Sequence, residues 1–306
     1  MNAVLSPRTM AISMAEWAKQ STRDEFQERL EDYLETVEAL RTTRVYVSDE
    51  MLSYLWSSSL APWRADVVMF NQIAPILYKR IARVQIPVST TATSCACTPV
   101  PSSACTTSDG PLDSGFMRLV HSVAAIESAF SVLGAPADTP TRVSMIQFIC
   151  KRHGIIADCP IFHDLAEYAR SLDLASLCWP TGANEDSRER LLTGMRLYSR
   201  AYLSLTGSEP RVWPILTPQF LEDLATQTAY RDKVMHALTL RAKLSQPAAV
   251  ASTELQDEKV KRLRGPRAGE RRFRATLELR VHYHLVGDCI KYERFYGPGE
   301  HDDGLS

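Results

Sequence analysis

The sequence predicts an α+β protein in which a mostly helical N-terminal region precedes a small C-terminal α+β domain. Apolar residues recur at spacings of three and four through most of residues 1–205, which is the helical pattern. Residues 273–285 instead alternate between apolar and polar side chains, as in a β-strand with one buried face. A chain of 306 residues allows two domains with sizeable cores, on a prior of roughly 100 to 200 residues each.

The first unit, residues 1–86, is expected to be mainly helical. Residues 11–41 repeat apolar positions on one helix face and carry acidic residues on the other. A short strand is predicted at 44–47 and a second helix at 51–56. Residues 66–86 have helical spacing and end at a proline, which closes the unit.

Residues 87–115 form a break rich in Ser, Thr and Pro, and we expect a linker or a long surface loop. Three of the seven cysteines, Cys95, Cys97 and Cys105, fall in this segment. Their spacing lacks the repeated close pairs of a zinc site, and an odd cysteine count does not suggest a disulfide framework. No metal site is therefore expected.

Residues 116–207 are predicted to be a helical region. Helical patterns cover 116–133, 139–153, 161–171 and 187–205. Start signals precede the last of these helices, and no chemical motif stands out in the region.

The last segment, residues 208–306, reads as an α+β unit. Thr217 and Pro218 are a helix start, with threonine as the N-cap and proline at the first helical position. The expected elements are a strand at 211–216, helices over 218–244 with a break near 227–230, a strand or bent strand pair at 272–286, a turn at 287–288 and a strand at 289–296.

The polar positions of the long strand gather residue types that hold phosphate or move protons: Arg274, Thr276, Glu278, Arg280, His282 and His284. Residues 259–280 hold nine basic residues against two acidic ones, a local charge of +7 in a chain whose net charge is -1. Such a cluster is the electrostatic footprint of a surface that contacts phosphates. Two plainer interpretations stay open, namely an antiparallel strand with a solvated side and a basic, solvated linker.

Several function classes lose support from the sequence. It has no P-loop, no dinucleotide-binding fingerprint, no G-x-S-x-G elbow and no H-E-x-x-H motif. No uninterrupted apolar run reaches the ~18 residues that a membrane span needs, so no membrane association is expected and a cytoplasmic location is the default.

The C-terminal third resembles the RelE/ParE superfamily of bacterial toxins. The matching features are Thr-Pro-Gln-Phe-Leu-Glu-Asp-Leu at 217–224, Arg-Phe-Arg at 272–274, Leu-Arg-Val-His-Tyr at 279–283 and the terminal Gly-Glu-His-Asp. The resemblance implies a compact domain with a strand, a helical hairpin and a curved antiparallel sheet. The N-terminal two thirds match no family that we recognise, and stand-alone toxins lack such an extension.

The resemblance implies one of two activities. RelE-like members are ribonucleases that cut messenger RNA, commonly on the ribosome, whereas ParE-like members inhibit gyrase and cut nothing. The expected partners are therefore RNA, the ribosome and an antitoxin-like protein, in a setting of bacterial stress or defence. RNA cleavage by the 2′-hydroxyl needs a base, a cation for the phosphorane and an acid for the leaving oxygen, but no cofactor or metal.

The residues expected to carry this chemistry lie after residue 258. His301 is the leading candidate for the acid, and His282, His284 or Glu270 for the base. Arg280 is expected to steady the reacting phosphate. The RNA-binding or phosphate-binding candidates are Lys259, Lys261, Arg262, Arg264, Arg267, Arg271, Arg272 and Arg274.

Three alternatives remain at this stage. Arg-Val-Tyr-Val-Ser-Asp-Glu at 44–50 resembles PIN-type nucleases, in which acidic residues bind Mg²⁺ or Mn²⁺, with Asp49, Glu50 and Asp66 as candidates. The second is a non-catalytic regulatory factor that binds nucleic acid or protein. The third is a structural protein in which the basic segment offsets the acidic N-terminal half.

Overall fold

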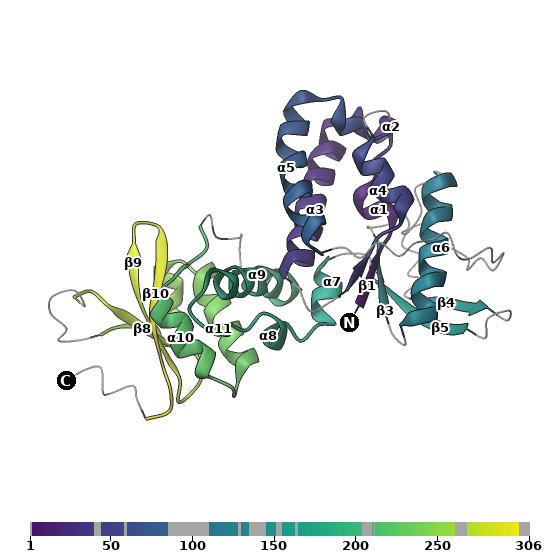
Figure 1. Ribbon diagram of the computed structural model, residues 1–306. Coiled ribbons are helices and arrows are strands. Elements are labelled where there is room, and N and C mark those ends of the chain that lie inside the picture. Colours follow the sequence, from purple (N-terminus) through teal and green to yellow (C-terminus); the bar gives the residue numbers. More distant parts are fainter. Residues whose placement is uncertain are drawn as a thin grey trace. The chain divides into compact units, whose positions relative to one another are not determined.

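The computed structural model describes residues 2–39, 44–57, 60–84, 110–127, 130–134, 145–150, 155–162, 165–203, 210, 212–260 and 268–299. It contains helices and two five-stranded sheets, so the α+β class is confirmed (Figure 1). The chain divides into two compact units, Met1–Tyr168 and Ala169–Ser306.

The N-terminal unit is built on a mainly parallel sheet with the strand order β2-β1-β3-β5-β4. β1 pairs in parallel with both β2 and β3, and β3 pairs in parallel with β5. Only β4 runs antiparallel to its neighbour β5. The strands are β1 (Asn2–Leu5), β2 (Val45–Tyr46), β3 (Phe130–Leu133), β4 (Met145–Cys150) and β5 (Ile155–Phe162).

Helix α6 packs on this sheet and supplies much of the core. Phe116, Leu119 and Val120 of α6 are buried against Val4 and Val132 of the strands. The helices of the unit are α1 (Pro7–Met10), α2 (Met14–Trp17), α3 (Gln20–Ala39), α4 (Asp49–Trp56), a 3-10 turn (Pro62–Arg64), α5 (Val67–Val84) and α6 (Gly110–Ile126).

The sequence-based prediction missed most of the strands in this unit. β4 takes the place of the helix predicted at 139–153, and β3 ends the one predicted at 116–133. The helix predicted at 161–171 is confirmed in part, because β5 runs to Phe162 and the short helix α7 (Leu165–Arg170) follows. Short apolar runs such as β3, inside the parallel part of the sheet, and β4, its antiparallel edge strand, have no period that separates strand from helix. The predicted linker is also too long at its end, because α6 begins at Gly110.

The C-terminal unit begins earlier than the predicted boundary at 208. Gly194 of α9 lies so close to α8 that a Cβ at this position would meet the Cβ of Cys178 at 2.5 Å. Trp179 also donates a hydrogen bond from Nε1 to the carbonyl oxygen of Leu224 (3.1 Å). The helices of the C-terminal unit are α8 (Leu174–Leu177), α9 (Glu185–Tyr202), α10 (Pro218–Thr226), α11 (Arg231–Lys243) and α12 (Gln246–Ala251).

The sheet of this unit follows the predicted order of one strand, a helical hairpin and antiparallel strands. Thr217 caps α10 through its side chain, and the hairpin breaks where Tyr230 takes a positive φ of 58°. The strand order is β6-β10-β9-β8-β7, in which only the β6–β10 pair is parallel. The strands are β6 (Ile215–Leu216), β7 (Glu258–Lys259), β8 (Arg271–Arg274), β9 (Arg280–Val286) and β10 (Cys289–Tyr296).

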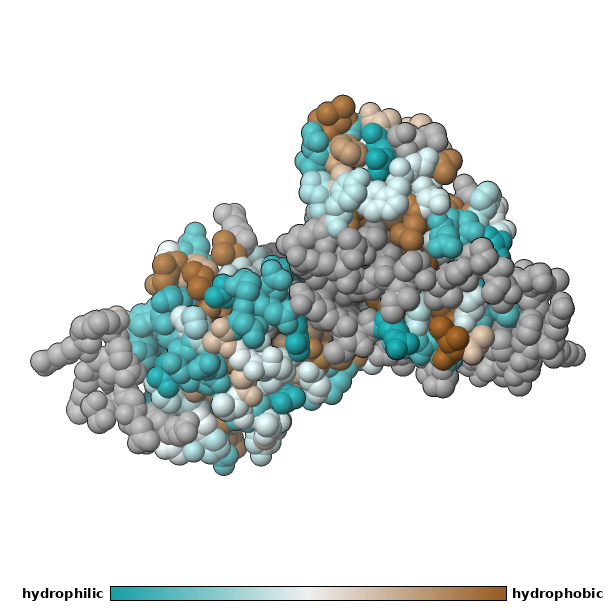
Figure 2. Space-filling model, viewed as in Figure 1, coloured by the Kyte–Doolittle hydropathy of each residue, from teal (hydrophilic) through white to brown (hydrophobic). Residues whose placement is uncertain are grey.

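The visible surface of the C-terminal unit is mainly hydrophilic, with a hydrophobic patch near the tip of the β9–β10 hairpin (Figure 2). Leu285 and Val286 are exposed at this tip. Within the described parts of the chain, no helix combines the length and the apolar character that crossing a membrane requires.

Candidate nucleic-acid interface

The two faces of the C-terminal sheet differ in character because side chains alternate along each strand. Phe273, Val281, Tyr283 and Tyr292 are buried on the face that packs against the helical hairpin. The pairs Arg272↔His282, Arg274↔Arg280, His284↔Lys291 and His282↔Arg294 place their side chains on the opposite face. We call this surface the basic face; it comprises Arg272, Arg274, Arg280, His282, His284, Lys291 and Arg294.

A buried histidine and a buried glutamate form a hydrogen-bonded pair at the centre of the basic face. His282 Nδ1 donates a hydrogen bond to Glu270 Oε1, and both side chains are almost fully removed from solvent. The ring of Tyr296 packs on His282, with 4.5 Å between the ring centroids. A carboxylate bound to one ring nitrogen fixes the tautomer, so the other nitrogen, Nε2, is the proton acceptor.

Three nitrogens on this face are buried and have no hydrogen-bond partner among the described residues. They are Nε2 of His282, Nε2 of His284 and Nη1 of Arg272. Arg272 and His282 sit directly opposite each other on neighbouring strands. Buried polar atoms are normally satisfied, so an unpaired set on one face indicates a place where a ligand or water belongs.

The cations of the basic face differ in how far they are neutralised. Arg272 pairs with Glu258 at 2.7 Å, Lys291 with Glu293 at 2.8 Å and Arg294 with Asp223 at 2.7 Å. Arg274 is half-buried, and although its backbone N–H donates to the carbonyl oxygen of Leu255 (2.7 Å), its guanidinium has no hydrogen-bond or ion-pair partner among the residues that the structure describes. Arg274 is thus the cation most available to a phosphate.

Arg280 does not lie free on the face, although it was predicted to hold the reacting phosphate. Its Nη1 donates to the carbonyl oxygens of Thr276, Leu277 and Leu279 at 3.0, 3.0 and 3.1 Å. These contacts fix the turn between β8 and β9. The direct role of Arg280 is therefore to hold the turn in shape.

A groove of about 680 Å³ runs beside the buried pair on the same face. Glu270, His284, Lys291, Glu293, Arg294 and Tyr296 line it. The groove joins proton-transfer groups to cations, which is the combination that metal-independent phosphodiester cleavage requires.

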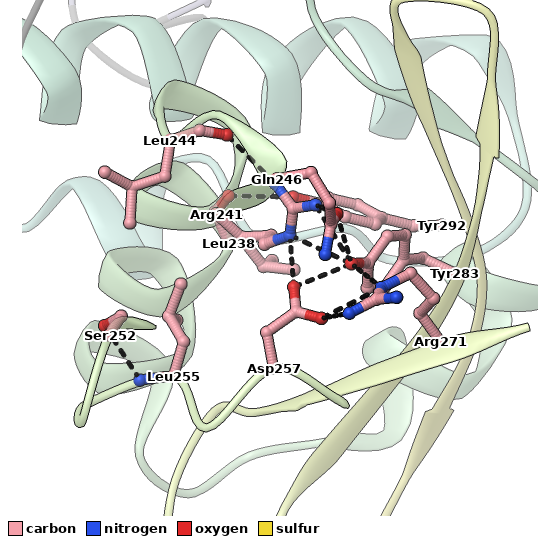
Figure 3. A network of polar contacts seen from close by, with 10 residues as sticks. All are labelled: Leu238, Arg241, Leu244, Gln246, Ser252, Leu255, Asp257, Arg271, Tyr283 and Tyr292. Atoms are coloured by element: carbon pink, nitrogen blue, oxygen red, sulfur yellow. Dashed lines mark hydrogen bonds and ion pairs between the residues drawn. The ribbon is translucent and has the colours of Figure 1, made fainter. Parts of the chain in front are cut away.

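Arg271 points to the helix side of the sheet and joins a polar network there (Figure 3). Arg271 Nη2 and Arg241 Nε contact opposite oxygens of Asp257 at 3.0 and 2.7 Å. The hydroxyl of Tyr283 donates to Asp257 Oδ2 (2.6 Å), and Arg241 also donates to Gln246. Arg271 was predicted to bind phosphate, but its charge is used inside the unit.

The network shifts the pKa values of its members. Burial alone would lower the pKa of Arg271, but hydrogen bonds to Tyr283 and Asp257 raise it above its usual value. Burial raises the pKa of Tyr283, and the neighbouring Asp257 adds to this effect while Arg241 opposes it.

The remaining predicted phosphate and catalytic residues are distributed as follows. Lys259 is exposed on β7, opposite Arg271, and its register places it on the helix side of the sheet. Lys261, Arg262, Arg264, Arg267 and His301 lie outside the described residues.

The sequence-based reasoning missed the contribution of β10 and α10 to the surface. Lys291, Glu293 and Arg294 of β10 and Asp223 of α10 were not proposed. The signal was available in part, because the apolar and polar alternation continues in the last strand. A register shift between Tyr292 and Arg294 interrupts that alternation and hides which residues share a face.

The acidic residues proposed for a PIN-like metal site are placed at helix starts. Glu50 pairs with Arg118, and Asp49 lies in the first turn of α4. Asp66 accepts hydrogen bonds from the backbone N–H groups of Val68 and Met69, as a helix cap does. Across the described ranges, no three His, Cys, Asp or Glu side chains gather closely enough to hold a metal ion.

Comparison with known proteins adds no family to these observations. No protein-family model matches the chain, and no curated protein matches its sequence.

Proposed function

We propose that the C-terminal unit binds RNA across the basic face and cleaves it without a metal, as a RelE-like endoribonuclease. One observation carries the proposal. The buried Glu270–His282 pair lies beside the groove, within a cluster of cations, and the acceptor nitrogen of His282 has no partner among the described residues.

In this proposal His282 Nε2 takes the proton from the 2′-hydroxyl as that oxygen attacks the neighbouring phosphorus. The carboxylate of Glu270 accepts the hydrogen bond from Nδ1 and stabilises the imidazolium that forms. His284, which lines the groove directly, is the alternative base. His301 remains the proposed acid for the leaving 5′-oxygen.

The arginines take different roles in the same reaction. Arg272 and Arg274 are proposed to bind the phosphate, because Arg272 has a buried unpaired Nη1 and the guanidinium of Arg274 has no side-chain partner among the described residues. Arg280 positions the turn between β8 and β9 and is a positioning residue. The nucleophile belongs to the substrate, so this chemistry needs no metal ion.

The order of elements in the unit supports the RelE-like assignment. A strand, the α10–α11 hairpin and antiparallel strands follow one another as the resemblance implies. The same assignment suggests a toxin-like role in the cytoplasm, acting on free or ribosome-bound RNA, with an antitoxin-like protein as its regulator.

The test is cleavage of labelled RNA, free and on ribosomes, by the full chain and its variants. We expect His282→Gln to lower the cleavage rate about 100-fold or more, since general base catalysis contributes roughly 10²–10⁴-fold. His301→Ala is expected to lower it similarly while RNA binding persists. His236→Gln, a half-exposed histidine on α11, is the matched control and should cleave normally.

A second function, RNA binding without cleavage, is favoured by a different observation. The side chain of His282 has no exposed area, and Arg280 is engaged by the turn. A regulatory factor of this kind would bind RNA with a strong salt dependence and would not respond to His301→Ala. The cleavage assay separates the two functions.

A further inference from the structure

A second hollow, of about 980 Å³, adjoins the groove on the basic face. The exposed side of α10, the segment before α9 and the end of β10 enclose it. Gln219, Arg294 and Tyr296 line both the hollow and the groove, so the two adjoin each other at these residues. The volume is at the upper end of the roughly 300–1,000 Å³ typical of small-molecule sites.

The two carboxylates in the hollow, Asp223 and Glu222, differ in their hydrogen-bond and ion-pair partners. Asp223 is occupied, because its oxygens accept from Arg294 Nε (2.7 Å), from the N–H of Phe295 (3.1 Å) and from Gln219 Nε2 (2.8 Å). Glu222 is exposed, and its carboxylate has no hydrogen-bond or ion-pair partner within the described part of the chain. Glu222 therefore offers two free acceptor oxygens to a ligand.

The charges indicate which part of an RNA strand each cavity suits. Lys291 and Arg294, which line the groove, pair with Glu293 and Asp223 and can exchange these partners for a phosphate, whereas the unpaired carboxylate of Glu222 repels phosphate from the hollow. A strand with a phosphate in the groove would therefore place a base in the hollow. Single-stranded RNA is read in this way, through hydrogen bonds to the Watson–Crick edge of a splayed base.

We propose that the hollow is a nucleobase subsite in which Glu222 selects guanine. Guanine presents two adjacent donors, N1–H and N2–H, on its Watson–Crick edge, which match the two oxygens of one carboxylate. Adenine and cytosine pair a donor with an acceptor on that edge, and uracil offers a single N–H donor. This inference rests on the proposed binding of RNA to the basic face, and it specifies guanine as the base that the adjoining hollow prefers.

The test uses the full chain and four fluorescein-labelled 2′-O-methyl oligonucleotides that differ only at one central base. The 2′-O-methyl group prevents cleavage, so fluorescence anisotropy reports binding alone. We expect the guanine oligonucleotide to bind about tenfold more tightly than the others, as a good bidentate contact allows. Glu222→Gln, whose amide offers one acceptor and one donor, should shift the preference away from guanine towards adenine and cytosine.

The matched control is Glu189→Gln, which removes the same charge from an exposed glutamate on α9. It should keep the guanine preference, because the readout is the ratio between bases and not the overall affinity. Equal binding of all four oligonucleotides, or a preference that Glu222→Gln leaves unchanged, overturns the subsite and leaves RNA binding intact. Failure of all four to bind overturns the proposed function itself.

Discussion

The two faces of the C-terminal sheet carry charged residues on the same strands, yet they use those charges differently. On the helix side, Arg241, Asp257, Arg271 and Tyr283 form a network in which each charge meets a partner, although the amide Nε2 of Gln246 at its edge has none among the described residues (Figure 3). On the basic face, Arg272, His282 and His284 each leave a buried nitrogen without a partner among the described residues.

The alternation of side chains along a strand therefore does not by itself identify a binding surface. Arg271 and Arg272 are neighbours in the sequence, but one neutralises a buried carboxylate and the other faces the groove side. A binding site differs from a structural network in how many of its charged and polar groups already have partners within the protein. A satisfied network ties elements together, whereas unsatisfied groups are available to a ligand.

The largest effect is expected from Asp257→Asn on the helix side. The change leaves two buried or half-buried arginines without their counter-charge, and breaking such a cluster costs about 3–5 kcal/mol of unfolding free energy. Urea unfolding followed by circular dichroism measures it. The adjacent Glu258→Gln removes an exposed pair with Arg272 and should cost under about 1 kcal/mol; equal losses for both variants would contradict the comparison.

The next effect concerns the buried pair of the basic face. Glu270→Gln keeps a hydrogen bond to His282 but removes the charge that would stabilise an imidazolium, so cleavage should fall about 10-fold or more. RNA affinity should change much less. Rates and binding are measured on the same preparation, after unfolding curves show that the variant is folded. A parallel loss of affinity and rate would indicate a merely structural role.

A smaller effect separates Arg274 from Arg271. Arg274→Ala should reduce the slope of log affinity against log salt by about 1, because one phosphate contact is lost. Arg271→Ala should leave that slope unchanged and instead lower the unfolding free energy, since its charge is used by Asp257. Anisotropy titrations at several salt concentrations provide the slopes. A lower slope for Arg271→Ala and an unchanged slope for Arg274→Ala would show that RNA contacts the helix side and not the basic face.

The smallest effect is a pH dependence of stability from the tyrosines of the helix side. Burial raises the pKa of Tyr283 and of Tyr292 above the ordinary 10.0. A raised folded pKa gives stability that is fully present below pH 10 and is lost as pH rises towards the folded value. We therefore expect unfolding free energies in urea to be insensitive to these groups from pH 7 to about 9 and to decline above pH 10. An increase in stability above pH 10 would contradict this.

Much of the C-terminal unit could be predicted from its sequence because its signals are local. Thr217 and Pro218 mark a helix start, and the alternation in β9 separates a buried face from a polar one. The sheet of the N-terminal unit could not be predicted in the same way. Its strands are short apolar runs such as Asn2–Leu5, and their pairing joins segments far apart in the sequence.

The candidate site was predictable in its residue types but not in its geometry. The sequence shows His282 and Glu270 but not that they bind each other, because their pairing depends on the register of β8 and β9. It also hides that Arg280 is held by carbonyl oxygens and that Arg294 meets Asp223 of α10. Such contacts depend on tertiary packing, which residue spacing does not encode.

The chemical ends of the RNA products test most directly whether the basic face cleaves RNA by attack of the 2′-hydroxyl. Labelled RNA, free and ribosome-bound, is incubated with the full chain in excess chelator, and the fragment ends are analysed. We expect 2′,3′-cyclic phosphate and 5′-hydroxyl ends, whose yield His282→Gln lowers about 100-fold or more. Fragments that require Mg²⁺ and carry 5′-phosphates, or no cleavage under any condition, would contradict this mechanism.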